Sequence, residues 1–200
     1  MKTIPNHSIV NGKSFLLTLG WILPSLAHAH VSPDHTSGAL NGLSHPLLGV
    51  DHILAMLAVG LWAAQQGGRA TWLVPASFVG LMAAGGMLGM AGFSLPFVEQ
   101  GILTSVLILG VLIAAAVRLP LAASMTVVGL FAIFHGYAHG TEMQAGVSGI
   151  SYGLGFALAT GGLHACGIGI GRLAQQSSKT PLLRFAGVVI ALAGLWLCLP

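Results

Sequence analysis

Four histidines and two carboxylates are concentrated in two short, otherwise apolar stretches of the sequence. Residues 45–52 read His-Pro-Leu-Leu-Gly-Val-Asp-His, and residues 134–142 read Phe-His-Gly-Tyr-Ala-His-Gly-Thr-Glu. The side chains that could bind a metal ion are His45, Asp51, His52, His135, His139 and Glu142. Imidazole favours nickel, cobalt, copper or zinc, whereas magnesium and calcium prefer shells of oxygen alone. These residue types predict a site for a divalent transition metal, and ligand type alone does not separate nickel from cobalt or zinc.

The first stretch is expected to open a helix, with Pro46 in the first turn, where its missing amide proton costs nothing. Seven residues make about two helical turns, so His45 and His52 are expected on nearly one face, with Asp51 on the flank. Asp51 and Glu142 would together supply the two negative charges that neutralise a divalent cation.

The second stretch is expected near the outer end of a helix. At about 100° per residue, His135, His139 and Glu142 fall within roughly 60° of one another. Gly136 and Gly140 stand beside the histidines. Because glycine has no side chain, another helix or the ion itself could come close to the backbone there.

Other histidines are weaker candidates. His164 lies about 17 residues into an apolar run, deeper than the two stretches, and is either an exit-side ligand or a structural histidine bonded to a neighbouring helix. His30 lies with Asp34 and His35 on a predicted outer tail, where they could gather ions, although we favour an ordinary solvated segment.

The elements that must position these groups are membrane helices. Of 200 residues, 55% are hydrophobic, 6% are charged and 29 are glycine, which excludes a water-soluble domain of this size. The net charge is +3, but the seven lysines and arginines are scattered singly and form no basic patch, so we expect no nucleic-acid partner. Cys166 and Cys198 are far apart and form no CxxC pair.

A signal peptide is predicted over residues 1–29. Lys2 and Lys13 precede an apolar run that ends in Ala27-His28-Ala29, an A-x-A cleavage signature. The alternative is an uncleaved first span, although the run is shorter than the roughly 20 residues a span needs. Cleavage would leave residues 30–45 as a short periplasmic segment and residues 46–200 as the transmembrane domain.

Six apolar runs of spanning length follow, so the predicted fold is an all-α membrane protein, a six-helix transmembrane bundle. The runs are 46–64, 71–91, 100–117, 121–141, 147–171 and 182–199. The basic residues after the signal segment all fall in alternate loops: Arg69, Arg118, Arg172, Lys179 and Arg184. Those loops are predicted to be cytoplasmic. Glu99 and Glu142 lie on the opposite side, together with the mature N-terminus.

Glycines and methionines in the spans are assigned to packing. Glycine pairs at four-residue spacing, which let helices approach closely in lipid, are Gly85/Gly89, Gly149/Gly153 and Gly167/Gly171. The methionines assigned to the core rather than to a metal are Met82, Met87 and Met90.

The two histidine stretches resemble the HupE/UreJ family of nickel permeases, which is associated with hydrogenase and urease maturation. The resemblance extends over essentially the whole chain, and neither signature carries a substitution. It implies nickel, or sometimes cobalt, as the transported ion and the bacterial inner membrane as the location. The six residues of the two stretches are the matching positions, whereas His164 lies outside both.

Two other function classes compete with a permease. Gly146-Val147-Ser148-Gly149 and His164 look like the GxSG motif and histidine helix of rhomboid proteases, but 16 residues of one continuous helix, roughly 24 Å, would separate the dyad. His135-Gly-Tyr-Ala-His139 lacks the glutamate of HExxH zinc proteases. A membrane metal sensor that does not transport remains open, although the chain has hardly any soluble surface for signalling.

The predicted activity is therefore ion uptake, with no catalytic residue and no resident cofactor. A hydrated ion would enter from the periplasm and exchange waters for the imidazoles of the two stretches. It would then pass inward, with His164 as a candidate later ligand. The expected partners are the ion and the lipid bilayer.

Overall fold

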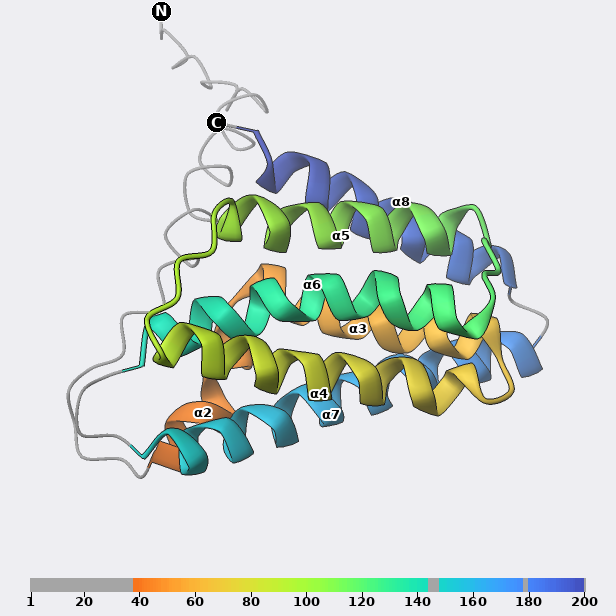
Figure 1. Cartoon of the computed structure of the whole chain (residues 1–200). Helices are drawn as coiled ribbons and strands as arrows, with labels where there is room; N and C mark the ends of the chain where they lie inside the picture. Colours follow the sequence, from red (N-terminus) through yellow and green to blue (C-terminus); the bar gives the residue numbers. More distant parts are fainter. Residues whose placement is uncertain (1–37, 144–147, 178–179, 200) are drawn as a thin grey trace, which may run out of the picture.

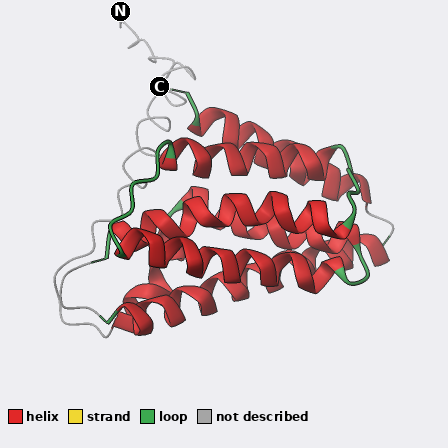
Figure 2. Ribbon diagram, viewed as in Figure 1, coloured by secondary structure: helices red, strands yellow, loops and turns green. Residues whose placement is uncertain are grey.

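A computed structural model describes residues 38–143, 148–177 and 180–199 of the chain. These residues form seven helices and no strand (Figure 2). The helices are α2 Gly38–Leu48, α3 Val50–Gln66, α4 Ala70–Met90, α5 Val98–Ala114, α6 Leu121–Thr141, α7 Gly149–Gln176 and α8 Thr180–Leu197. The predicted signal peptide, together with His30, Asp34 and His35, lies outside the described residues.

The chain is a multi-pass membrane protein. Four helices, α4, α6, α7 and α8, are long and apolar enough to cross a bilayer, and the count rises to five if α2 and α3 form one broken span. Helix α5 is apolar but has only 17 residues. The outward faces are rich in large apolar side chains, such as Leu158, which is 70% exposed on α7, and Phe185, which is 63% exposed on α8. Such surfaces suit lipid rather than water.

The helices lie side by side in one bundle (Figure 1). Helix α4 packs on α6, α5 on α8, and α7 on both α2 and α3. The loops α3–α4 and α5–α6 lie at one end of the bundle, where α7 ends and α8 begins, and the loop α4–α5 lies at the other end (Figure 1). Arg69 and Arg118 belong to the first two loops. The prediction that Arg172 and Arg184 also lie in a loop is wrong, because Arg172 lies near the end of α7 and Arg184 near the start of α8. Lys179 lies outside the described residues.

The predicted span 46–64 is broken. Helix α2 ends at Leu48 and α3 starts at Val50, and the two helices meet at 84°. Gly49 between them is extended, with φ −97° and ψ 122°, and Pro46 lies inside α2 rather than opening a helix. Because Pro46 donates no hydrogen bond and Gly49 leaves the helical conformation, the backbone turns here. The prediction of one continuous helix face for the first stretch is therefore wrong.

Glycines allow α4 and α6 to pack backbone against backbone. A Cβ atom on Gly85 or Gly89 would collide with backbone carbonyls of α6, and a Cβ atom on Gly136 or Gly140 would collide with backbone carbonyls of α4. The role predicted for the first glycine pair is confirmed. From the sequence, Gly136 and Gly140 are expected to admit either another helix or the ion. The structure shows a helix, α4, in close contact with both.

The other two glycine pairs differ from each other. Gly167 faces the backbone of α3, and a Cβ atom on Gly171 would lie 2.7 Å from the side chain of Ala64. Their packing role is confirmed. In contrast, Gly149 faces methionine sulfur atoms, and Gly153 has open space where a Cβ atom would be. No close helix contact explains Gly153.

The methionines also divide. Met82 is 5% exposed and belongs to the core, as predicted. Met87 and Met90 are 60% and 46% exposed, so their assignment to the core is wrong. The sequence could not distinguish Met82 from Met87 and Met90. A membrane helix is apolar on its lipid-facing side as well as on its buried side, so its sequence does not mark which side is buried.

The C-terminal end of α3 is held in place by polar side chains. The Trp62 indole donates a 3.0 Å hydrogen bond to the Val117 carbonyl. The Gln66 amide donates to the Ser124 hydroxyl at 2.6 Å and accepts from the Leu119 amide at 3.3 Å. These bonds fasten one end of α3 to the loop α5–α6 and to the first turn of α6. Asp51 and His52 lie at the other end of α3, so these bonds help to fix their position.

Candidate metal centre

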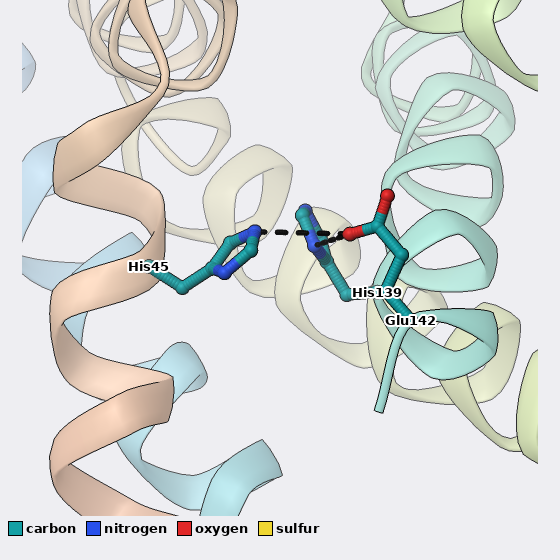
Figure 3. Close-up of side chains that lie close together, drawn as sticks. All are labelled: His45, His139 and Glu142. Carbon is teal, nitrogen blue, oxygen red and sulfur yellow. Dashed lines mark ion pairs between the residues drawn. The ribbon is translucent and has the colours of Figure 1, made fainter. Parts of the chain in front are cut away.

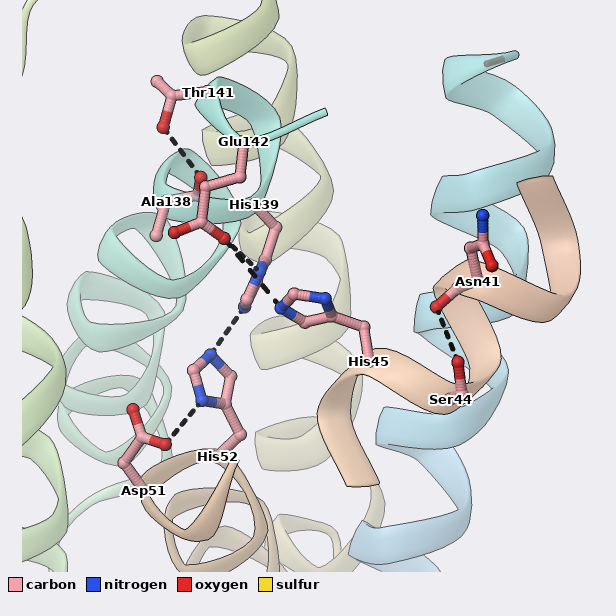
Figure 4. A network of polar contacts seen from close by, with 9 residues as sticks. All are labelled: Asn41, Ser44, His45, Asp51, His52, Ala138, His139, Thr141 and Glu142. Carbon is pink, nitrogen blue, oxygen red and sulfur yellow. Dashed lines mark hydrogen bonds and ion pairs between the residues drawn. The ribbon is translucent and has the colours of Figure 1, made fainter. Parts of the chain in front are cut away.

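The two histidine stretches meet at the end of the bundle opposite the arginine-bearing loops. His45 lies in the last turn of α2, Asp51 and His52 lie in the first turn of α3, and His139 lies in the last turn of α6 (Figure 4). The positive end of the α3 dipole favours the carboxylate of Asp51. The bend between α2 and α3 thus presents two histidines from two helices to a third helix.

Three side chains form a group with metal-ligand spacing: His45, His139 and Glu142 (Figure 3). Glu142 Oε2 lies 3.9 Å from His45 Nε2 and 3.6 Å from His139 Nδ1. All three ligand atoms lie within 4.8 Å of one another. Ligands bound to one ion at about 2.0–2.2 Å are at most about 4 Å apart, so a small closure would complete the group around one ion.

The chain of hydrogen bonds from Asp51 through His52 to His139 identifies which imidazole nitrogens are unprotonated. Asp51 Oδ1 lies 2.9 Å from His52 Nδ1, and an ionised carboxylate can only accept, so this nitrogen carries the proton. Neutral His52 then offers a lone pair at Nε2, which lies 2.6 Å from His139 Nε2. His139 must therefore donate from Nε2, which leaves its Nδ1 unprotonated.

The unprotonated nitrogen of His139 faces another acceptor. Its Nδ1 is buried, makes no hydrogen bond with any residue that the structure describes, and points toward the carboxylate of Glu142. Two acceptors at this distance repel each other unless a cation lies between them. With the carboxyl groups ionised and the imidazoles neutral, the geometry therefore fits a positive ion held by His45, His139 and Glu142.

The structure divides the six predicted ligands into three groups. His45, His139 and Glu142 converge; Asp51 and His52 pair with each other and reach the group through His52 Nε2. Asp51 therefore orients His52, and His52 in turn accepts from His139, so Asp51 and His52 support the group of three without belonging to it.

His135 lies one turn deeper on α6. It is fully buried, and its ring centroid is 5.4 Å from that of His52. Its Nδ1 lies 3.0 Å from the Phe131 carbonyl, and its Nε2 has no hydrogen-bond partner. His135 thus lies next to the candidate group of His45, His139 and Glu142 and is not part of it.

His164 lies deeper still, on α7. It is 2% exposed, and its Nδ1 lies 2.8 Å from the Met56 carbonyl of α3. The bond to a neighbouring helix that a structural histidine needs is therefore present. Its Nε2, however, has no hydrogen-bond partner within residues 38–143, 148–177 and 180–199.

Sequence reasoning missed the aromatic wall of the site, which belongs to α7. The Phe156 ring centroid lies 4.4 Å from that of His139 and 6.2 Å from that of His45, and Tyr152 lies 6.3 Å from His45. Their four-residue spacing indicates one helix face. No sequence signal places that face against the histidines, because the contact is between helices far apart in the chain.

Tyr137, inside the second stretch, also has a role that its position did not reveal. Its hydroxyl donates to the Phe93 carbonyl at 2.6 Å and accepts from the Leu95 amide at 3.2 Å. These bonds fasten the loop α4–α5 to α6 at the end of the bundle that carries the site.

The protease alternative has no dyad in the structure. Ser148 is the N-cap of α7 and its hydroxyl accepts from the Ser151 amide, whereas His164 lies far along the same unbroken helix. A serine nucleophile needs hydrogen-bond contact with its base, and a continuous helix keeps these two side chains apart.

Comparison with known proteins assigns the chain to a family. A family model described as HupE / UreJ protein matches residues 17–197. The chain belongs to this family. Protein HupE of Rhizobium leguminosarum bv. viciae is 48% identical over 172 residues, which cover 86% of this chain and 90% of that protein. No solved structure matches the chain.

Replacing Asp51 by asparagine is the first test of the hydrogen-bond order in this member of the HupE/UreJ family. The variant keeps the shape of the side chain but loses the charge that holds the proton on His52 Nδ1. Since partners of this kind are worth about 10–100-fold in metal affinity, we expect nickel binding by the purified protein to weaken by about that factor. If isothermal titration calorimetry gave the variant and the wild type equal affinity for nickel, the proposed chain of hydrogen bonds from Asp51 to His139 would be contradicted.

Proposed function

We propose that the chain is a permease for a divalent transition metal, with nickel as the first candidate and cobalt or zinc as alternatives. The observation that supports this most is the convergence of His45, His139 and Glu142, with an unprotonated histidine nitrogen facing a carboxylate. The ligand types favour a transition metal over magnesium or calcium. Nickel is the ion that the family resemblance implies.

The proposed membrane arrangement is six spans in the bacterial inner membrane. It counts α2 and α3 as one broken span and α5 as a short sixth span. The metal-binding group then opens to the periplasm, and the arginine-bearing loops face the cytoplasm. In this arrangement the mature N-terminus is periplasmic, and the imported ion would supply hydrogenase or urease maturation.

The proposed first step is ligand exchange at the group of His45, His139 and Glu142, which we call the outer group. A hydrated ion loses water as it takes up the carboxylate of Glu142 and the imidazoles of His45 and His139. Phe156 covers one side of these rings. An apolar wall limits re-entry of water, which strengthens electrostatic attraction at the site.

Radioactive nickel accumulation in cells tests this proposal, with cobalt and zinc as competitors. We expect the protein to raise accumulation above that of cells without it, and excess cobalt to compete more strongly than excess zinc. Stronger suppression by cobalt than by unlabelled nickel would make cobalt the substrate. Metal binding by the purified protein without any accumulation would favour a sensor that does not transport.

Uptake is expected to weaken in acid. Histidine binds metal only as the neutral imidazole, and protons compete for the same nitrogen. With an ordinary histidine pKa of about 6.5, lowering the external pH from about 7.5 to about 5 should reduce the initial rate. Measurement at constant membrane potential separates this effect from a change in driving force, and an unchanged rate at about pH 5 would contradict histidine ligation.

A further inference from the structure

We propose that His164 is a second, inner station for the transported ion, reached from the outer group by way of His135. The proposal rests on the proposed function, because it assigns the site to which the ion moves after the outer group. Four observations support it: the hydrogen-bond state of both histidines, their place below the outer group, the ring that contacts both of them, and the space beside His164.

Both histidines present an unused lone pair inside the protein. A carbonyl can only accept, so the 2.8 Å contact with Met56 and the 3.0 Å contact with Phe131 put the proton on Nδ1 of His164 and of His135. In each neutral ring, Nε2 is then a bare acceptor that is buried and unpartnered. Leaving such a group unsatisfied is unfavourable, because burial removes it from water and no other hydrogen bond replaces the one lost.

This hydrogen-bond state is the one found in metal-binding histidines. The ring nitrogen that does not bind the metal donates to a carbonyl or carboxylate, which fixes the tautomer and the ring orientation. A purely structural His164 would need only the bond to Met56. The unpartnered nitrogen is what a structural role leaves unexplained and an ion-binding role requires.

The buried face of α7 connects the two sites. Phe156, which contacts His45 and His139, is followed by Thr160 and then by His164, all buried and each four residues from the last. Eight residues correspond to about 12 Å along the helix. His164 therefore lies below the outer group on the same face, toward the cytoplasmic end.

One aromatic ring contacts both of the deeper histidines. The Phe78 ring centroid is 5.6 Å from that of His135 and 5.1 Å from that of His164, and Phe78 is fully buried. The ring offers no ligand atom to an ion beside it. We therefore treat His135 and His164 as separate stations, one on each contact of this ring.

Space is present beside His164. A largely apolar groove of about 210 Å³ between α4 and α7, open at the side of Trp72, is lined by His164 and by residues that include Val79 and Ile168. Among the residues that line it, His164 is the one metal-ligating side chain. An ion bound to His164 would therefore have one imidazole from this lining as a ligand, a weak site suited to release.

Two variants of His164 test the inference in proteoliposomes, in a parent chain with Cys166→Ser and Cys198→Ser. His164→Gln can still donate to the Met56 carbonyl but lacks the imidazole. We expect its initial rate of radioactive nickel uptake to fall about tenfold, while nickel binding by the purified protein at the outer group stays within about twofold of the parent.

The second variant, His164→Cys, changes the ligand class. Thiolate prefers softer ions, so the cadmium concentration that halves nickel uptake is expected to fall about tenfold relative to the parent. A histidine that only packs helices together would change the uptake of all ions alike. Leu158→Ala, on the exposed face of the same helix, serves as the control and should leave both values unchanged.

The outcomes separate this inference from the proposed function. Normal uptake by His164→Gln, or an unchanged cadmium value for His164→Cys, overturns the inner station while the permease assignment stands. A parent that takes up no nickel, cobalt or zinc overturns the proposed function itself.

Discussion

His139→Ala is expected to reduce nickel uptake at least about 100-fold, the largest functional effect of any single substitution in the chain. His139 contacts both other members of the outer group and also His52. Its Nδ1 lies 3.6 Å from Glu142, its ring centroid lies 4.6 Å from that of His45, and its Nε2 lies 2.6 Å from His52 Nε2. The variant removes one proposed ligand and also leaves His52 without its partner. Loss of a supporting group alone is worth about 10–100-fold, so loss of a ligand should exceed that range.

The measurement is the initial rate of nickel uptake at equal amounts of protein in the membrane. Thr141→Val is the matched control, because Thr141 lies on the same helix and, among the described residues, its hydroxyl bonds to the Ala138 carbonyl alone, at 2.7 Å. We expect the control to transport normally. Uptake by His139→Ala at the rate of the control would show that the outer group does not carry the ion.

Gly136→Ala is expected to give the largest loss of stability. A Cβ atom at this position would collide with the Met82 carbonyl and lie 2.9 Å from the Gly86 amide nitrogen, both backbone atoms of α4. No side-chain rotation relieves such a contact, so α4 and α6 must separate. Overpacking of this kind costs about 1–3 kcal/mol or more, and the shift would move His135 and His139 with α6.

Thermal unfolding of the purified variants, followed by size-exclusion chromatography with fluorescence detection, checks this prediction. Gly153→Ala is the control, since a Cβ atom there meets open space. We expect a lower midpoint for Gly136→Ala and an unchanged or higher one for Gly153→Ala, because alanine favours helices over glycine by about 0.5–1 kcal/mol. Equal midpoints would contradict the close packing of α4 on α6.

Much of the fold could be predicted because lipid leaves few choices to the backbone. Each predicted apolar run coincides with a helix or, for 46–64, with the bent pair of α2 and α3. A spanning segment must satisfy its own hydrogen bonds, so apolar length is informative. The bend was missed because Pro46 is also a common first residue of helices, and only the extended backbone of Gly49 shows that the helix stops there.

The site could be predicted in its residue types but not in its connections. Helical spacing correctly suggested that His135 and His139 share the buried side of α6. It could not reveal that His139 and Glu142 meet His45, or that Asp51 bonds to His52, because these contacts depend on the bend and on how the bundle brings the ends of α2, α3 and α6 together. Side-chain direction within one helix follows from its period, whereas contacts between helices follow from the whole bundle.

The most direct test of the account is nickel uptake into liposomes that contain only the purified protein. The account predicts a rate above that of protein-free liposomes, saturation with nickel concentration, and loss of the rate in a His45→Ala/Glu142→Gln double variant that remains folded. Wild-type protein that binds nickel yet gives the rate of protein-free liposomes would contradict it.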